Sequence, residues 1–160
     1  VTNQWVNSYK RLIAGYEAPV YISWARVNRS DLIRVPAYKQ GREESVRIEY
    51  RAPDPACNPY LAFAVMLAAG LDGVERGMEA PAPVEENVYE ISDEERERRG
   101  IGMLPESLWD AILIAEKSEM MREALGAHVL DSFARNKKIE WGQYKAQVTD
   151  YELKKYLPIL

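Results

Sequence analysis

Three charged side chains alternate along one short segment of this sequence, and their types fit chemistry on phosphate groups or metal ions. Within residues 46–51, Arg47, Glu49 and Arg51 share one side, and apolar or aromatic side chains share the other. Successive side chains of a strand point to opposite faces, and residues two apart lie about 7 Å from each other. A carboxylate between two guanidinium groups could therefore hold a metal ion beside an anionic substrate. The alternative is an exposed strand whose charges neutralise one another.

Further candidate side chains precede this row. Arg11 lies in a polar segment, Glu17 lies in a loop that Pro19 keeps out of helical geometry, Arg29 falls near a predicted turn, and Arg34 falls within a predicted strand. Taken one at a time, such charged groups are ordinary surface residues. Their concentration in the first third of the chain makes binding of an anionic ligand the functional hypothesis.

The charge distribution narrows the class of partner. Residues 1–59 carry nine Lys/Arg and six Asp/Glu, a net charge of +3, whereas the remainder carries −7 in a chain of net charge −4. A basic third inside an acidic chain favours a small anion over nucleic acid, which usually requires a basic domain. No apolar run reaches the roughly 20 residues needed to span a bilayer, and the single Cys57 cannot form an internal disulfide. We expect no nucleic-acid or membrane partner and a cytoplasmic location.

The elements that must position these side chains predict an α+β fold. Strand-like segments at 20–24 and 31–35 favour an antiparallel hairpin, which the 46–51 strand follows. Asn58-Pro59 is a favoured pair for starting a helix. Residues 60–69 are apolar on every side, which predicts a helix buried on all faces. We thus expect antiparallel strands in the first third, then a buried helix, then a C-terminal helical region.

That helical region shows clear start and stop signals. Ser107 and Ser118 are N-cap candidates, Gly126 is placed to end a helix, and Thr149 with Glu152 has the pattern of a capping box. Between Gly126 and Thr149, one further helix is predicted to bury a single stripe of side chains, namely Val129, Phe133, Trp141, Tyr144 and Val148.

Four motifs in order and spacing carry a specific resemblance: NSYKRL, GYEAP, NRSxLIRVP and RIEYRxPDPxxNPYLAFAxMLAAGLDG. The chain resembles the C-terminal part of type I glutamine synthetases from about Thr2 to the final helix, and most strongly between Asn7 and Gly73. The resemblance implies that residues 1–160 are a C-terminal segment of the catalytic domain. The N-terminal β-grasp domain and the first part of the catalytic domain would then be absent.

The resemblance implies roles for the substrate-facing residues. Arg11 and Arg51 would bind the substrate glutamate. Glu17 matches the catalytic flap glutamate, which closes the site, shields the intermediate from water and helps to form the ammonium site. An acyl phosphate hydrolyses readily, so such a lid suits the chemistry.

It also implies roles toward the nucleotide and the metal. Arg29 and Arg34 match arginines that hold phosphate, and Arg29 would be catalytic by stabilising the transferring phosphoryl group. Arg47 would contact the phosphates of ATP. Glu49 would ligate one of two Mg²⁺ or Mn²⁺ ions, because hard divalent cations prefer oxygen ligands.

The activity implied for the full-length protein is ATP-dependent ligation of ammonia to glutamate through a γ-glutamyl phosphate. With one metal ligand, the 160 residues alone are expected to be inactive. One alternative keeps this chemistry with a polyamine or alkylamine in place of ammonia, and another is a non-catalytic binding or assembly module. The last segment, TDYELKKYLPIL, resembles the helix with which these synthetases grip a facing ring, so a homo-oligomer, a dodecamer in full-length relatives, is expected.

Overall fold

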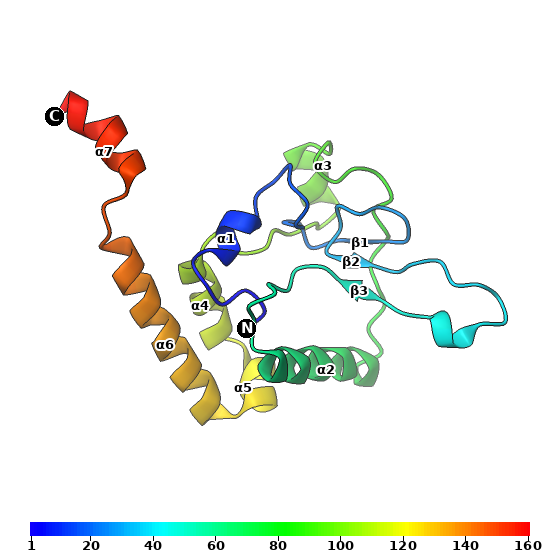
Figure 1. Ribbon diagram of the computed structural model, residues 1–160. Helices are drawn as coiled ribbons and strands as arrows, with labels where there is room; N and C mark the ends of the chain where they lie inside the picture. The colour runs from blue at the N-terminus through cyan, green and yellow to red at the C-terminus, as the bar shows by residue number, and fades with distance from the viewer.

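The computed structural model describes residues 1–160 and shows a mixed α+β body from which a helical arm projects (Figure 1). All three strands lie between α1 and α2, and helices alone follow. In chain order the elements are α1 (Ser8–Arg11), β1 (Trp24–Ala25), β2 (Ile33–Arg34), the 3₁₀ turn η1 (Glu43–Ser45), β3 (Glu49–Tyr50), α2 (Pro59–Glu75), α3 (Asp93–Arg98), α4 (Leu108–Glu116), α5 (Glu119–Leu125), α6 (Ala127–Lys145), α7 (Asp150–Tyr156) and the 3₁₀ turn η2 (Leu157–Ile159).

The sheet is small and mixed, with strand order β1-β2-β3. β2 and β3 are antiparallel, with Arg34 opposite Glu49, but β1 and β2 are parallel. The predicted hairpin is therefore wrong. Its connection does not turn tightly because Asn28 accepts hydrogen bonds from Ser30 and donates to the backbone carbonyl of Glu86, which draws the loop toward a distant segment.

The strand predicted at 46–51 contains only the two residues of β3. Val46 and Ile48 do not enter a core, since their exposed fractions are 59% and 66%. The ladder is short because β2 offers it few partners; only the hydrogen bond from Arg51 N to Leu32 O extends it. The charge row consequently lies partly outside regular strand geometry.

The main core lies between α1, the loop that follows it and the segment before α3. It contains seven buried side chains: Leu12, Ala18, Val20, Tyr21, Val84, Val88 and Ile91. A second contact joins α4 to α6 through Leu108, Ile112, Leu130 and Ala134, all buried. These two regions fix α1 and the sheet, the elements that carry the candidate site.

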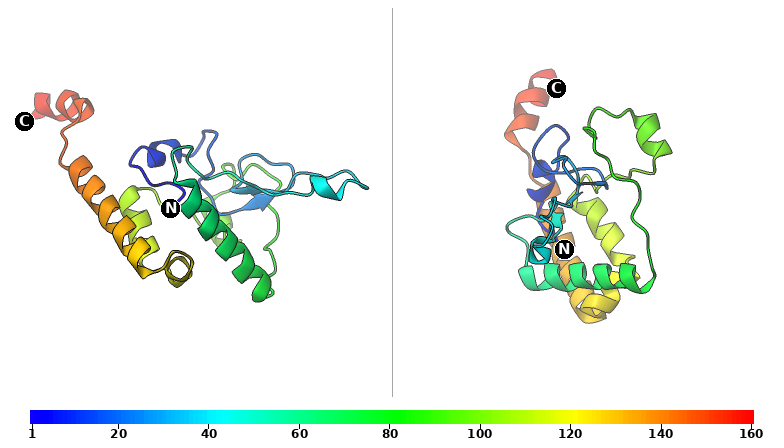
Figure 2. Two further views of the ribbon diagram at one scale, coloured as in Figure 1. Left: turned by 60° about the horizontal axis from the view of Figure 1, so that its bottom comes forward. Right: turned by 90° about the vertical axis from the view of Figure 1, so that its right-hand side faces the viewer.

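Helix α2 packs against α5 beneath the sheet (Figure 2), but it is not buried on all faces as predicted. Ala62 is its only buried residue, and the exposed fractions of Tyr60, Phe63 and Leu67 are 84%, 68% and 64%. The helix also continues through both of its glycines to Glu75. An all-round apolar pattern predicts that something covers the helix, but it does not say that these 160 residues do.

The start of α2 is the one predicted: Asn58 is the N-cap, and its side-chain oxygen accepts from the backbone N–H groups of Tyr60 and Leu61 at 3.0 and 3.3 Å. An Asn58→Ala substitution leaves both donors unpaired. We expect it to lower the free energy of unfolding by about 1 kcal/mol, measured by urea denaturation. Asn58→Asp keeps an acceptor and is the control. Equal losses in both variants would show that the side-chain acceptor at position 58 does not stabilise the helix.

The C-terminal helices follow the predicted signals. Ser107 and Ser118 cap α4 and α5, Gly126 separates α5 from α6, and Thr149 and Glu152 form the capping box of α7. The stripe predicted for α6 is wrong, because the buried residues of this helix are Leu130, Ala134 and Lys137, and Val148 lies beyond the end of the helix at Lys145.

The chain ends in an arm. Residues 150–160 are all exposed, and α7 with η2 stands clear of the body in Figure 1. None of the helices has the length and apolar character that crossing a membrane would require.

Candidate functional site

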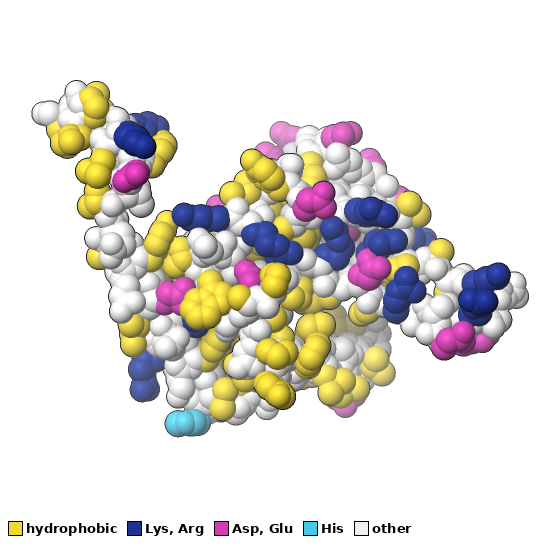
Figure 3. Space-filling model, viewed as in Figure 1, with side chains coloured by type: hydrophobic (Ala, Val, Ile, Leu, Met, Phe, Trp, Pro, Cys, Tyr) yellow, Lys and Arg dark blue, Asp and Glu magenta, His cyan; other side chains and the backbone are white.

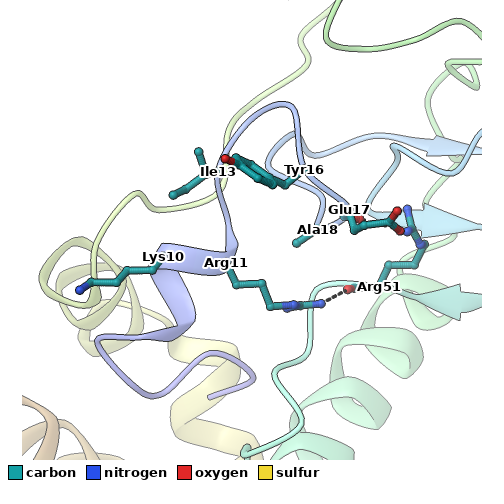
Figure 4. A pocket seen from close by; sticks show the side chains of 7 residues that line it. All are labelled: Lys10, Arg11, Ile13, Tyr16, Glu17, Ala18 and Arg51. Carbon is teal, nitrogen blue, oxygen red and sulfur yellow. Dashed lines mark hydrogen bonds between the residues drawn. The ribbon is translucent and has the colours of Figure 1, made fainter.

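Helix α1, the loop after it and the residue after β3 meet around an open pocket of about 750 Å³ (Figure 4). Its lining residues are Lys10, Arg11, Ile13, Tyr16, Glu17, Ala18 and Arg51. Three predicted site residues, Arg11, Glu17 and Arg51, are thus brought together from segments up to 40 residues apart. The structure groups two guanidinium groups and one carboxylate at one wall.

The two arginines of this pocket donate hydrogen bonds to backbone carbonyls. Arg11 donates to Ala52 O at 2.9 Å and to Arg51 O at 3.2 Å, and Arg51 donates to Asp31 O at 3.4 Å and Glu17 O at 3.2 Å. Carbonyl groups orient a guanidinium without neutralising it. Neither arginine forms an ion pair, so both positive charges are available to a carboxylate ligand.

The loop that carries Glu17 is held at both ends. Gly15 has φ +88°, a left-handed conformation that favours glycine. On the other side Ala18 is buried, and its carbonyl accepts a hydrogen bond from the Tyr89 hydroxyl at 3.1 Å. Burial raises the pKa of Tyr89, which keeps that hydroxyl protonated as a donor. Glu17 itself is exposed between these anchors.

A second open pocket of about 750 Å³ adjoins the first and shares Tyr16 and Glu17 with it. Arg29 lies in this second pocket, beside Ser30 and Asn87. Arg29 is exposed, and no ion pair involves it. Arg29 therefore lines a pocket that shares Glu17 with the pocket of Arg11 and Arg51.

Arg34 and Glu49 face each other across β2 and β3 and form an ion pair of 2.9 Å. The Nε atom of Arg34 is buried without a hydrogen-bond partner. Glu49 offers an oxygen ligand of the type that Mg²⁺ prefers, but no three His, Cys, Asp or Glu side chains of the chain come close enough to hold a metal. A complete metal site does not exist within these 160 residues.

Arg47 is exposed, two residues before the start of β3, and donates to the carbonyl of Ser45. It lines neither of the two pockets. The predicted row is therefore divided, with Arg51 in the first pocket and Glu49 paired on the sheet. Lys and Arg side chains nevertheless form a band across one face of the body (Figure 3).

Asp31 is a feature that the sequence pattern did not single out. It is fully buried, and neither carboxylate oxygen has a hydrogen-bond partner. Burial raises its pKa, and the neighbouring Ser23 hydroxyl and the more distant Arg51 charge oppose the shift only in part. Because the backbone carbonyl of Asp31 accepts a hydrogen bond from Arg51, this buried carboxyl group belongs to a residue that contacts the pocket lining.

The raised pKa of Asp31 predicts the direction in which stability changes with pH. The folded state keeps the Asp31 proton above the ordinary value of 3.8, where the unfolded state has released it, so stability falls as pH rises through and above that value. We expect Asp31→Asn to stabilise the protein at pH 8 by about 1–3 kcal/mol. The advantage should shrink as the pH falls toward 3.8, as followed by the thermal midpoints of both proteins between pH 8 and pH 4. A constant difference across this pH range would contradict the assignment.

Two residues that support the site were not predicted: Tyr89, which anchors the Glu17 loop, and Asp54, which follows Arg51. Tyr89 lies in an acidic stretch that indicates an exposed loop, and no local signal marks its contact 71 residues away. Asp54 stands between two prolines, where a turn-forming side chain is ordinary.

Comparison with known proteins gives consistent matches. Residues 1–156 match the family described as glutamine synthetase, catalytic domain. The chain is 54% identical over 159 residues to the glutamine synthetase of Mycobacterium tuberculosis (strain ATCC 25618 / H37Rv), covering 99% of this chain and 36% of that protein. It is 52% identical over 157 residues to that of Methanocaldococcus jannaschii, covering 98% and 34%.

A solved structure is also similar. The GmaS/ADP complex in its conformation 1 superposes with a TM-score of 0.83 at 35% identity, covering 99% of this chain and 35% of that one. The chain spans about a third of the length of the curated relatives it matches.

Proposed function

The chain belongs to the glutamine synthetase catalytic-domain family, and we propose that the full-length protein ligates ammonia to the side-chain carboxylate of glutamate. In this reaction ATP transfers its terminal phosphoryl group to the carboxylate, which gives ADP and γ-glutamyl phosphate. Ammonia then attacks the acyl carbon, loses a proton and releases phosphate, which leaves glutamine.

The observation that carries this proposal is the first pocket. Arg11 and Arg51 present two unpaired guanidinium groups, which match an amino-acid substrate that carries two carboxylates. Glu17 lies between this pocket and the one lined by Arg29. A carboxylate in that place can attract ammonium and accept its proton while Arg29 faces the phosphoryl group. The arrangement supports glutamate on one side of Glu17 and phosphate on the other.

ATP and a divalent metal, Mg²⁺ or Mn²⁺, are the proposed co-substrate and cofactor, as the family implies. Arg34 and Arg47 would serve phosphate oxygens, and Glu49 would supply one oxygen ligand. When bound, the metal would neutralise phosphate charge. The structural relative in complex with ADP supports a nucleotide site in this fold.

We propose that the 160 residues alone do not catalyse this reaction. They bring together no three metal-ligating side chains, and α2 leaves a broad apolar face uncovered. In the full-length protein, the remaining part of the catalytic domain would cover α2 and supply the missing ligands. The exposed C-terminal arm would contact further copies in a homo-oligomer.

The direct test is to supply the full-length protein with glutamate, ATP, Mg²⁺ and ammonium and to measure glutamine and phosphate. Equimolar formation of both products is expected. The isolated 160 residues, assayed in parallel, should form neither. ATP hydrolysis without glutamine would contradict the proposal.

The alternative amine donors need a separate comparison, because a polyamine or an alkylamine could replace ammonia in the same acyl-phosphate chemistry. The curated glutamine synthetases are 52–55% identical to this chain. We expect ammonium to give the highest kcat/KM in a panel that includes methylamine and a polyamine. A preference for either amine would replace ammonia in the proposal while leaving the acyl-phosphate chemistry intact.

A further inference from the structure

Asp54 joins the two segments that carry the arginines of the first pocket. Its Oδ2 atom accepts a hydrogen bond from the Ser8 hydroxyl at 2.8 Å, and its Oδ1 atom accepts from the Ala56 backbone N–H at 2.8 Å. Its own backbone N–H donates to Thr2 O at 2.8 Å. One residue thus ties the loop after β3 to the segment that leads into α1.

A small movement of Ser8, which is the partner of Asp54, would also move Arg11. Ser8 is fully buried and is the first residue of α1, and Arg11 is the last residue of the same single turn. The Ser8 hydroxyl also accepts from the backbone N–H of Trp5, so this oxygen has two partners. A one-turn helix has little stability of its own, and its position depends on such anchors.

Asp54 also lies close in the chain to the other arginine, Arg51. Asp54 follows Arg51 by three residues, and the loop between them provides the Ala52 carbonyl to which Arg11 donates. Arg11 therefore depends on this loop twice, through its own guanidinium and through Ser8. No acidic side chain forms an ion pair with either arginine, so Asp54 joins the segments that carry them through the Ser8 hydroxyl and not through the guanidinium groups.

We propose that Asp54 is a positioning residue that fixes the spacing of the Arg11 and Arg51 guanidinium groups for a ligand with two carboxylates. This inference rests on the proposed function of the first pocket. Hydrogen bonds to a carboxylate are about twice as strong as neutral ones, and a misplacement of about 1 Å can reduce a rate by about 100-fold. The second pocket and the Arg34–Glu49 pair do not depend on this contact, so the effect should be selective for glutamate.

The test is steady-state kinetics of the full-length protein. Asp54→Ala should raise the KM for glutamate by about 10-fold and change the KM for ATP less than about twofold. Asp54→Asn keeps one acceptor oxygen, and its amide can donate to Ser8, so it should recover most of the loss. Ser8→Ala should raise the KM for glutamate in the same direction. The double variant should be no worse than Asp54→Ala, because both act through one contact.

Asp131→Ala is the matched control, since it removes an aspartate contact to Arg122 at the α5–α6 junction; its two KM values should stay unchanged. Equal increases of both KM values in Asp54→Ala would overturn the inference, as would a lower thermal midpoint with unchanged KM for glutamate. Arg11→Ala and Arg51→Ala test the pocket separately from the role of Asp54. If neither raises the KM for glutamate, the proposed pocket is wrong; if both do and Asp54→Ala does not, only the positioning role fails.

Discussion

Arg51→Ala in the full-length protein is expected to reduce kcat/KM for glutamate by about 100-fold, which corresponds to about 2.7 kcal/mol. The guanidinium lines the first pocket and has no carboxylate partner within the chain. Its charge is therefore unused until a ligand arrives. Truncating one partner of a hydrogen-bonded charge pair costs about 2–5 kcal/mol, and the lower part of that range fits this open pocket.

Two further variants test whether the loss of kcat/KM in Arg51→Ala comes from the missing guanidinium group. Arg51→Lys keeps the charge but not the planar fork, so it should recover only a small part of the activity. Arg76→Ala removes an exposed arginine that pairs with Asp72 on α2, and it should leave kcat/KM unchanged. The measurement is initial-rate phosphate release at varied glutamate with saturating ATP. If Arg51→Ala alters only the KM for ATP, Arg51 does not bind glutamate.

The sequence predicted local features of the fold that depend on neighbouring residues. Helix starts at Asn58, Ser107, Ser118 and Thr149 are confirmed, because an N-cap is satisfied by backbone groups two or three residues away. Pairing of strands was predicted less well. The direction of β1 against β2 depends on contacts of Asn28 with a segment near residue 86, and no periodicity reports such a contact.

Burial was the least predictable property. The pattern of α2 indicates an apolar environment on all sides, but within residues 1–160 only Ala62 is buried. On α6 the buried residues differ from the predicted stripe and include Lys137. Lysine is almost never buried without a partner. A search for apolar residues at helical spacing does not select a lysine. Its burial is explained by its ion-pair partner, which the sequence pattern does not identify.

For the site, motif resemblance led to residues that the fold brings together in part. Arg11, Glu17 and Arg51 share one pocket, and Arg29 lies in the adjoining one. The alternation of residues 46–51 alone would have grouped Arg47 with them, which the short β3 does not do. The roles of these residues stay predictions, and the kinetic variants above test them.

The largest stability effect is expected at Glu140, which is the partner of that buried lysine. Lys137 Nζ lies 2.8 Å from Glu140 Oε2, and the side chains are 5% and 22% exposed. The other carboxylate oxygen accepts from the Val6 backbone N–H at 3.2 Å, and the ammonium lies 3.9 Å from the centre of the Trp5 ring. Glu140 thus holds α6 to the segment that leads into α1.

Glu140→Ala would leave the Lys137 charge buried without its partner and the Val6 N–H without an acceptor. Breaking a buried pair in this way costs about 3–5 kcal/mol, and the partial exposure of Glu140 points to about 3 kcal/mol. A loss of this size lowers the thermal midpoint. We therefore expect a lower midpoint for Glu140→Ala than for the unchanged protein, measured by differential scanning calorimetry on the full-length protein.

A matched pair tests whether burial is the cause. Glu116 and Lys138 form the same kind of contact at 2.6 Å between α4 and α6, but the side chains are 35% and 41% exposed. Glu116→Ala should therefore cost less than about 1 kcal/mol. Replacing both Lys137 and Glu140 by methionine removes the two charges together and should recover most of the stability. If Glu116→Ala and Glu140→Ala destabilise equally, burial of Lys137 does not decide the effect, because the exposed pair would then matter as much as the buried one.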